Sequence, residues 1–120
     1  MMAALEMAYH VETYSSGTHG RAICNARTHH WVADDGGGDA VGAGELFLSG
    51  ITACAVNMVE RIALTDDAPV DFMEVTAEAF RDPEATPGDV SLYADVRIHF
   101  KIWGVDDDQG NYLVDTWKKR

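Results

Sequence analysis

Two cysteines are the residues of this sequence whose chemistry could extend beyond packing. Cys54 lies in the middle of a long apolar segment, and Cys24 lies among small residues near the start of the chain. The thiolate is the reactive form of cysteine, and an unperturbed thiol with a pKa of about 8.5 is mostly protonated at neutral pH. A reactive Cys54 therefore needs a cation from another element or another subunit, because the middle of a helix gains nothing from the helix N-terminus.

Arg21 and Arg27, which precede the long apolar segment, are the candidate cations. The hypothesis is that one of them pairs with the Cys54 thiolate while Glu45 orients its guanidinium as a bidentate acceptor. The alternative is that Cys54 is a small core residue, as buried free cysteines often are. Cys24 could resolve a Cys54 sulfenic acid only if their Cα atoms came within about 7 Å, and we interpret it as a packing residue.

Metal and phosphate sites are not expected. Adjacent histidines on a strand point to opposite faces, so His29 and His30 do not readily share a metal. The glycine-rich stretch from 36 to 44 lacks the Gly-Lys-Ser/Thr ending of a phosphate-binding loop. We therefore predict neither a metal nor another cofactor.

Composition narrows the class of protein. The chain has 120 residues, a net charge of −11 and a pI near 4.6. A single domain is expected at this length, and the acidic charge disfavours nucleic acid and anionic membrane surfaces as partners. Two cysteines are too few for a disulfide-stapled secreted domain, and the start does not have the pattern of a signal peptide. These features predict a cytoplasmic protein.

The segment from Glu45 to Leu64 must position Cys54. It is apolar on nearly every side, which predicts a helix buried on every side. Glu45, Glu60 and Arg61 interrupt the apolar run before the length of a membrane span. One 120-residue chain has little left to cover the second face, so a second copy is the expected cover, and a twofold dimer is the commonest assembly. The alternative is that the C-terminal helix covers that face alone.

The remaining elements are short strands and one further helix. Alternation of apolar and polar residues predicts strands at 73–79 and 90–102, joined by a long turn, and weaker patterns predict strands at 9–14, 21–25 and 28–33. The aspartates at 106–108 are expected to cap a final helix that includes Leu113, Val114 and Trp117. The order of these elements predicts an α+β fold with antiparallel sheets.

The loop from 34 to 44, followed by Glu45-Leu46 and ending on Ala53-Cys54, resembles the OsmC/Ohr family. These are osmotically inducible and organic-hydroperoxide-resistance proteins, and the sequence is most similar to their OsmC-like branch. The resemblance covers nearly the whole chain and is specific from Asp34 to Arg61. It implies an OsmC-like fold, with antiparallel sheets packed on a long central helix, and an intertwined homodimer.

The same resemblance implies a thiol peroxidase with two cysteines, the reactive one at Cys54. The family's second cysteine belongs to a Cys-Pro motif after the second helix, where this chain ends at Arg120. The family's C-terminal strand and this motif are therefore expected to be absent, as in a truncated form of a longer chain. In the hydroperoxide-reducing branch, an arginine stands where this sequence has Thr18 and a glutamate where it has Gly44. Glu45 instead matches the OsmC-like branch.

Two functions follow as expectations. The first is an OsmC-like thiol redox protein that reduces a small organic hydroperoxide through Cys54 in oxidative or osmotic stress defence. The alternative is a non-enzymatic dimer that binds a small hydrophobic ligand among apolar side chains such as Phe47, Met58, Trp31 and Trp103. An enzyme requires a reactive Cys54, whereas a binding protein tolerates Cys54→Ala.

Overall fold

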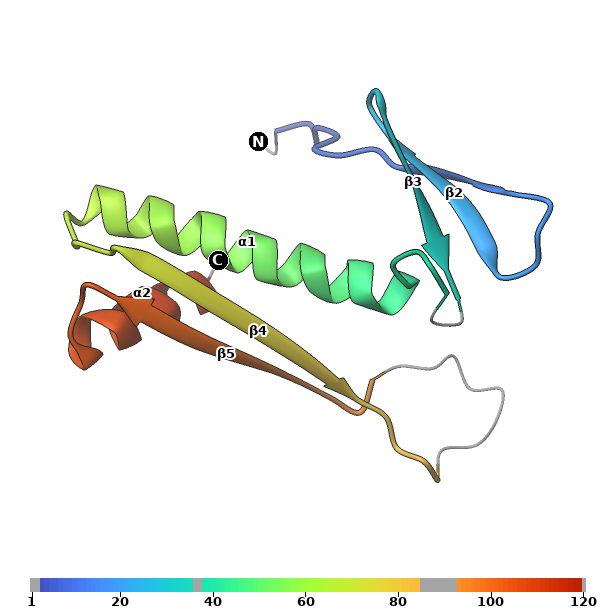
Figure 1. Ribbon diagram of the computed structural model, residues 1–120. Coiled ribbons are helices and arrows are strands. Elements are labelled where there is room, and N and C mark those ends of the chain that lie inside the picture. Colours follow the sequence, from blue (N-terminus) through green and yellow to red (C-terminus); the bar gives the residue numbers. More distant parts are fainter. Residues whose placement is uncertain (1–2, 36–37, 85–92, 120) are drawn as a thin grey trace. The chain divides into compact units, whose positions relative to one another are not determined.

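The computed structural model describes residues 3–35, 38–84 and 93–119 (Figure 1). The chain divides into two compact units, Met1–Leu46 and Phe47–Arg120. The boundary falls near the start of the long helix. Each unit is described by itself.

The first unit contains a three-stranded antiparallel sheet in the order β1-β2-β3. Its strands are β1 (Glu12–Ser15), β2 (Arg21–Ala26) and β3 (His29–Asp34). All three predicted strands are present, but β1 begins at Glu12 rather than at Tyr9. Glu12 pairs with Asn25, next to the last residue of β2, so the residues before Val11 lie beyond the end of the neighbouring strand.

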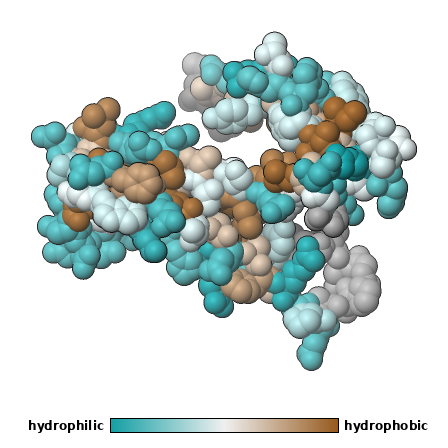
Figure 2. Space-filling view, viewed as in Figure 1, coloured by the Kyte–Doolittle hydropathy of each residue, from teal (hydrophilic) through white to brown (hydrophobic). Residues whose placement is uncertain are grey.

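The long helix α1 (Ala43–Thr65) confirms the predicted element. Within a single chain α1 is buried along one side, and the expected cover of its second face by another copy stays a prediction. Its buried residues form one stripe, whereas Phe47 is 57% exposed, Leu64 is 84% exposed and Cys54 is also exposed. Figure 2 shows hydrophobic side chains at the surface along the course of α1. The buried stripe consists of Ala55, Val59, Ile62 and Ala63.

A hydrophobic core lies under the C-terminal half of α1. There Val59, Ile62 and Ala63 pack with Leu113 of the second helix, and Met73, Phe100, Ile102 and Trp117 pack against this cluster. By length and composition alone, α1 is also long and apolar enough to cross a membrane. Its packing in this cluster favours the predicted core helix instead.

The second unit contains a two-stranded antiparallel sheet of β4 (Phe72–Phe80) and β5 (Asp95–Trp103). The predicted alternation is confirmed, because every second residue is half-buried and the residues between are exposed. Residues 90–92, which were predicted to begin the second strand, lie outside the described residues. On the exposed face, His99 Nε2 lies 3.0 Å from Glu78 Oε1, and Lys101 forms an ion pair with Glu74.

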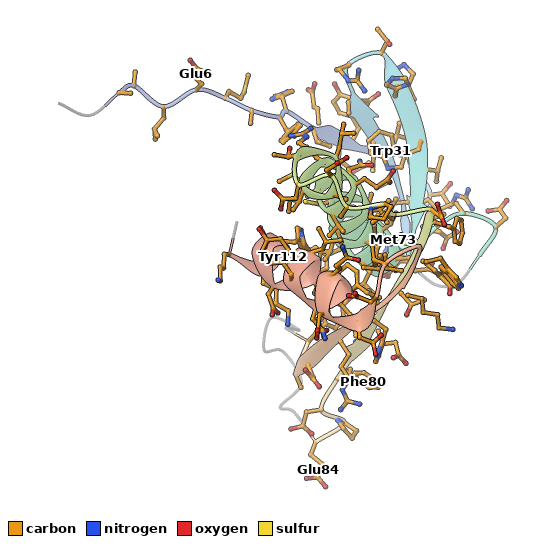
Figure 3. All side chains as sticks on the ribbon, turned by 90° about the vertical axis from the view of Figure 1, so that its left-hand side faces the viewer. Glu6, Trp31, Met73, Phe80, Glu84 and Tyr112 are labelled. Carbon is orange, nitrogen blue, oxygen red and sulfur yellow. The ribbon has the colours of Figure 1, made fainter. Side chains whose placement is uncertain are left out.

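The second helix, α2 (Asp107–Lys118), covers the same face of this sheet as α1. The Leu113 side chain is fully buried, and the Trp117 ring meets the Phe100 ring edge-on at 5.5 Å between centroids. Figure 3 shows Tyr112 on α2 and Met73 on β4, with Phe80 at the end of β4 away from α2. The unit is therefore a two-layer structure with both helices on one side of the sheet.

Asp106 caps α2 as the sequence predicted. Its carboxylate accepts a hydrogen bond from the Gln109 N–H at 2.8 Å, and the Gln109 side chain accepts one from the Asp106 N–H. This is a capping box. Since an N-cap aspartate contributes about 1 kcal/mol, we expect Asp106→Ala to lower the free energy of unfolding by about that amount in urea titrations. Asp108→Ala, in the same turn, is the control. An equal loss in both variants would contradict the capping role.

Candidate functional site

Cys54 opens into a groove of the second unit. The groove has a volume of about 740 Å³ and lies between α1, β5 and α2. Besides Cys54, its lining residues are Met58 of α1, Val96, Ile98 and Phe100 of β5, and Val114, Trp117 and Lys118 of α2.

The periodicities of the three elements place these side chains together. Cys54 and Met58 are four residues apart and so share a face of α1. The lining residues of β5 occupy alternate positions and therefore point to the same side of the sheet. On α2, Val114 and Lys118 are one turn apart and Trp117 lies between them. Ala55 and Val59, both fully buried, hold α1 against the core beside the groove.

The described lining of the groove is apolar apart from two residues. Among the described lining residues, Cys54 is the only thiol and Lys118 is the only charged one. Because the Cys54 side chain is exposed, a molecule that enters the groove can reach the thiol without local unfolding. An apolar wall beside an accessible thiol suits a small apolar reactant.

The groove agrees with the sequence-based expectation only in part. Of the four residues proposed to line a hydrophobic ligand site, Met58 lines this groove; Trp103 instead contacts Phe72 at 5.3 Å between ring centroids. Lys118 was not among the residues that the sequence indicated as part of a site, but it lines the groove. Its one-turn spacing from Val114, on an amphipathic helix, was the signal that could have placed it at the groove.

Arg21 is held within the first unit by two carboxylates. Its Nη1 lies 3.1 Å from Asp34 Oδ2 and 2.6 Å from Asp39 Oδ1. The hydrogen bond and charge of Asp39 raise the pKa of Arg21, and Arg21 in turn lowers the pKa of Asp39. The guanidinium lies at a second cavity, of about 730 Å³, that is lined by residues of this unit including His19, Arg21 and Asp34.

Arg27 and Glu45 have different surroundings. Arg27 is exposed in the turn between β2 and β3, with a φ of 56°, and it makes no ion pair within the described ranges. Glu45 Oε1 accepts a hydrogen bond from the Gly42 N–H at 2.9 Å, which ties the loop to the first turn of α1. Among the described residues, no arginine pairs with Glu45. The proposed pairing of an arginine with Cys54 therefore stays a prediction.

Cys24 is a buried packing residue. It is 8% exposed and lies in the central strand β2, between Thr13 of β1 and Trp31 of β3. Both cysteines are free thiols. Because Cys24 is buried and Cys54 is exposed, Cys24 is not expected to compete with Cys54 for reagents in the folded protein.

The Arg21–Asp39 pair predicts a dependence of stability on pH. The pKa of Asp39 is lower in the folded chain, so its contribution is present above the unfolded-state value of about 3.9. The contribution is lost as pH falls through the lowered folded value. We expect Asp39→Asn to reduce the urea midpoint slightly at neutral pH, with the difference from wild type disappearing in acid. A difference that grows in acid would contradict this, and Asp35→Asn is the control.

Comparisons with solved structures identify the fold. An OsmC-like protein from Mycoplasma pneumoniae superposes with a TM-score of 0.84 at 14% identity, over 97% of this chain and 84% of that one. An organic hydroperoxide resistance protein OsmC from Legionella pneumophila gives a TM-score of 0.75 at 18% identity, over 98% of this chain and 85% of that one. A putative osmotic stress induced and detoxification response protein from Psychrobacter arcticus gives 0.71 at 12% identity, over 97% and 85%.

The chain has the OsmC-like fold. The α+β architecture with antiparallel sheets, which the resemblance implied, is thereby confirmed. No protein-family model and no curated protein matches the sequence. At these identities the likeness establishes the fold, so function rests on the site.

Proposed function

We propose that this protein is an OsmC-like thiol redox enzyme that reduces small organic hydroperoxides through Cys54. The observation that carries the proposal is the position of Cys54, whose exposed thiol forms part of the wall of an apolar groove. The fold supports it, because one structural neighbour is described as an organic hydroperoxide resistance protein. Two free cysteines fit a reducing compartment, and we place the protein in the cytoplasm.

The proposed reaction needs one reactive cysteine of this chain, Cys54. The Cys54 thiolate attacks the terminal oxygen of the hydroperoxide, the O–O bond breaks, and the alkoxide takes a proton and leaves as an alcohol. Cys54 is then a sulfenic acid. A dithiol reductant restores the thiol: one of its sulfur atoms attacks Cys54 and releases water, and the other closes a disulfide. The supply of both electrons by the dithiol makes a second reactive cysteine in this chain unnecessary.

We also propose a homodimer. One chain leaves much of α1 uncovered, including Phe47 at 57% and Leu64 at 84% exposure. Large exposed apolar patches typically mark interaction surfaces, and a second copy of the chain is the partner we infer. Sedimentation of the purified protein at several concentrations tests this inference, and a single species of 13.1 kDa throughout would contradict it.

Within such a dimer, the second copy could also supply the cation that the sequence predicted. Of the two arginines, Arg27 is the better candidate, because Arg21 is already held by Asp34 and Asp39. Glu45 would orient the arginine through its second carboxylate oxygen, since Oε1 accepts the Gly42 N–H.

The test of the proposed function is the pH dependence of Cys54 alkylation in a Cys24→Ala background. An activated thiol is expected to reach its half-maximal rate below about pH 8.5, the value of an unperturbed cysteine. A midpoint at or above that value, or no reaction before unfolding, would overturn the proposal. An unfolded sample in denaturant provides the reference rate at each pH.

The groove favours one alternative function. Its volume of about 740 Å³ lies within the range of roughly 300–1,000 Å³ of small-molecule sites, and its lining is mostly apolar. A non-enzymatic protein could bind a small hydrophobic ligand there. Binding of an apolar fluorescent probe that survives Cys54→Ala, together with an unreactive Cys54, would favour this alternative.

A further inference from the structure

We propose that Lys118 is a cation of the same chain that favours the Cys54 thiolate, in addition to the arginine proposed from a second copy. The inference rests on the proposed function, because it concerns activation of the same thiol. Lys118 would act as a positioning residue on the far side of the groove, on the last turn of α2.

The first argument is the distribution of charge around the groove. Cys54 and Lys118 are the only titratable residues among its described lining. The charged residues of β5 and β4 alternate onto the opposite face, where Arg97 pairs with Asp95 and His99 with Glu78. On α1, Arg61 does not line the groove but lines a small neighbouring pocket that shares Met58 with it. The charged side chains of α2 that do not line the groove are Asp107, Asp108 and Asp115, and Lys119, the C-cap residue, does not line it either.

The second argument is the availability of the ammonium group. In the part of the chain that the structure describes, no carboxylate forms an ion pair with Lys118. The other described lining residues are apolar, so none of them offers an opposite charge to a thiolate at Cys54. An opposite charge within about 6 Å favours the ionised form of a thiol, and the flexible lysine side chain can move its charge toward Cys54.

The third argument comes from the end of α2. The last carbonyl groups of a helix carry a partial negative charge, and this end of α2 forms one side of the groove. Without a cation at this end of α2, the partial negative charge would disfavour a thiolate at Cys54. Lys118 offsets that charge, so its neutralisation is expected to have a larger effect than the removal of a distant surface lysine.

The experiment measures the pH midpoint of Cys54 alkylation in variants made on the Cys24→Ala background. We expect Lys118→Gln to raise the midpoint by about 0.5 to 1 pH unit, as the loss of one partly solvated charge would. The thiolate fraction at neutral pH then falls about three- to tenfold. Lys118→Arg should keep the original midpoint. Lys119→Gln is the matched control, because it removes the same charge from a neighbouring position that does not line the groove.

Each outcome bears on a different claim. An unchanged midpoint in Lys118→Gln, or an equal shift in Lys119→Gln, would overturn the role of Lys118 and leave the proposed function standing. In the Cys24→Ala protein without further changes, an alkylation midpoint at or above about pH 8.5 would overturn both the role of Lys118 and the proposed function. The absence of a reaction at Cys54 while the protein is folded would do the same. A rise in Lys118→Gln with rescue by Lys118→Arg supports a charge effect rather than lost packing.

Discussion

Cys54→Ser is expected to reduce the consumption of organic hydroperoxide to the rate of the dithiol reductant alone. Serine keeps the size of the side chain but not the nucleophilic sulfur, so the groove persists while the reaction stops. The measurement is the loss of cumene hydroperoxide with time in the presence of excess dithiol.

Cys24→Ser is the matched control for this prediction. Because Cys24 is 8% exposed in the central strand of its sheet, its replacement should leave turnover close to wild type per mole of folded protein. Full activity in Cys54→Ser, or its loss in Cys24→Ser but not in Cys54→Ser, would contradict the assignment of Cys54. Binding of an apolar probe in both variants establishes that the groove is intact.

Leu113→Ala is expected to have the largest effect on stability. Leu113 is fully buried and packs with Val59, Ile62 and Ala63, so it joins α2 to α1 over the sheet. Truncation of a buried leucine costs about 2–5 kcal/mol, from lost burial and the cavity that remains. The change should appear as a lower urea midpoint and as weaker probe binding, since α2 forms one wall of the groove.

Tyr112→Ala tests whether this effect is specific to the core. The neighbouring Tyr112 is 55% exposed, and a surface substitution of this kind typically changes stability by less than about 0.5 kcal/mol. Similar losses in the two variants would indicate that α2 as a whole is sensitive to truncation. A loss below about 1 kcal/mol in Leu113→Ala would contradict the packing described for the core.

The elements that the sequence predicted best are those with strong local signals. The alternation of apolar and polar residues predicted strand β5, and the aspartates at 106–108 predicted the cap and the start of α2. Both signals depend on neighbouring residues only, so they can be read from the sequence. The start of β1 was missed because it depends on where the neighbouring β2 ends. The pattern of residues 9–11 continues the alternation, but no neighbouring strand reaches them.

The burial of α1 could not be predicted for a single chain. An all-apolar helix shows that cover is needed on each side, but it does not show whether the same chain provides it. The structure covers only the stripe of Ala55, Val59, Ile62 and Ala63 and leaves Cys54 exposed. The exposed remainder is what supports a second copy as partner.

The candidate site was predicted in part. Cys54 stood out because a nucleophile in the centre of an apolar helix is conspicuous in the sequence. Lys118 did not, because 64 positions separate the two residues in the numbering and only the packing of α2 beside α1 brings them to one groove. The ion pairs of Arg21 were also not foreseen, since Asp39 lies in a loop with no periodic pattern.

The most direct test of the central claim is the mass of Cys54 after one equivalent of cumene hydroperoxide. Cys24→Ala protein would be mixed with the hydroperoxide and a dione that traps sulfenic acids, then digested and analysed by mass spectrometry. Our account predicts the trapped adduct on the Cys54 peptide of the folded protein, with one alcohol formed per adduct. An unmodified Cys54 peptide with the hydroperoxide intact would contradict it and leave the groove as a binding site only.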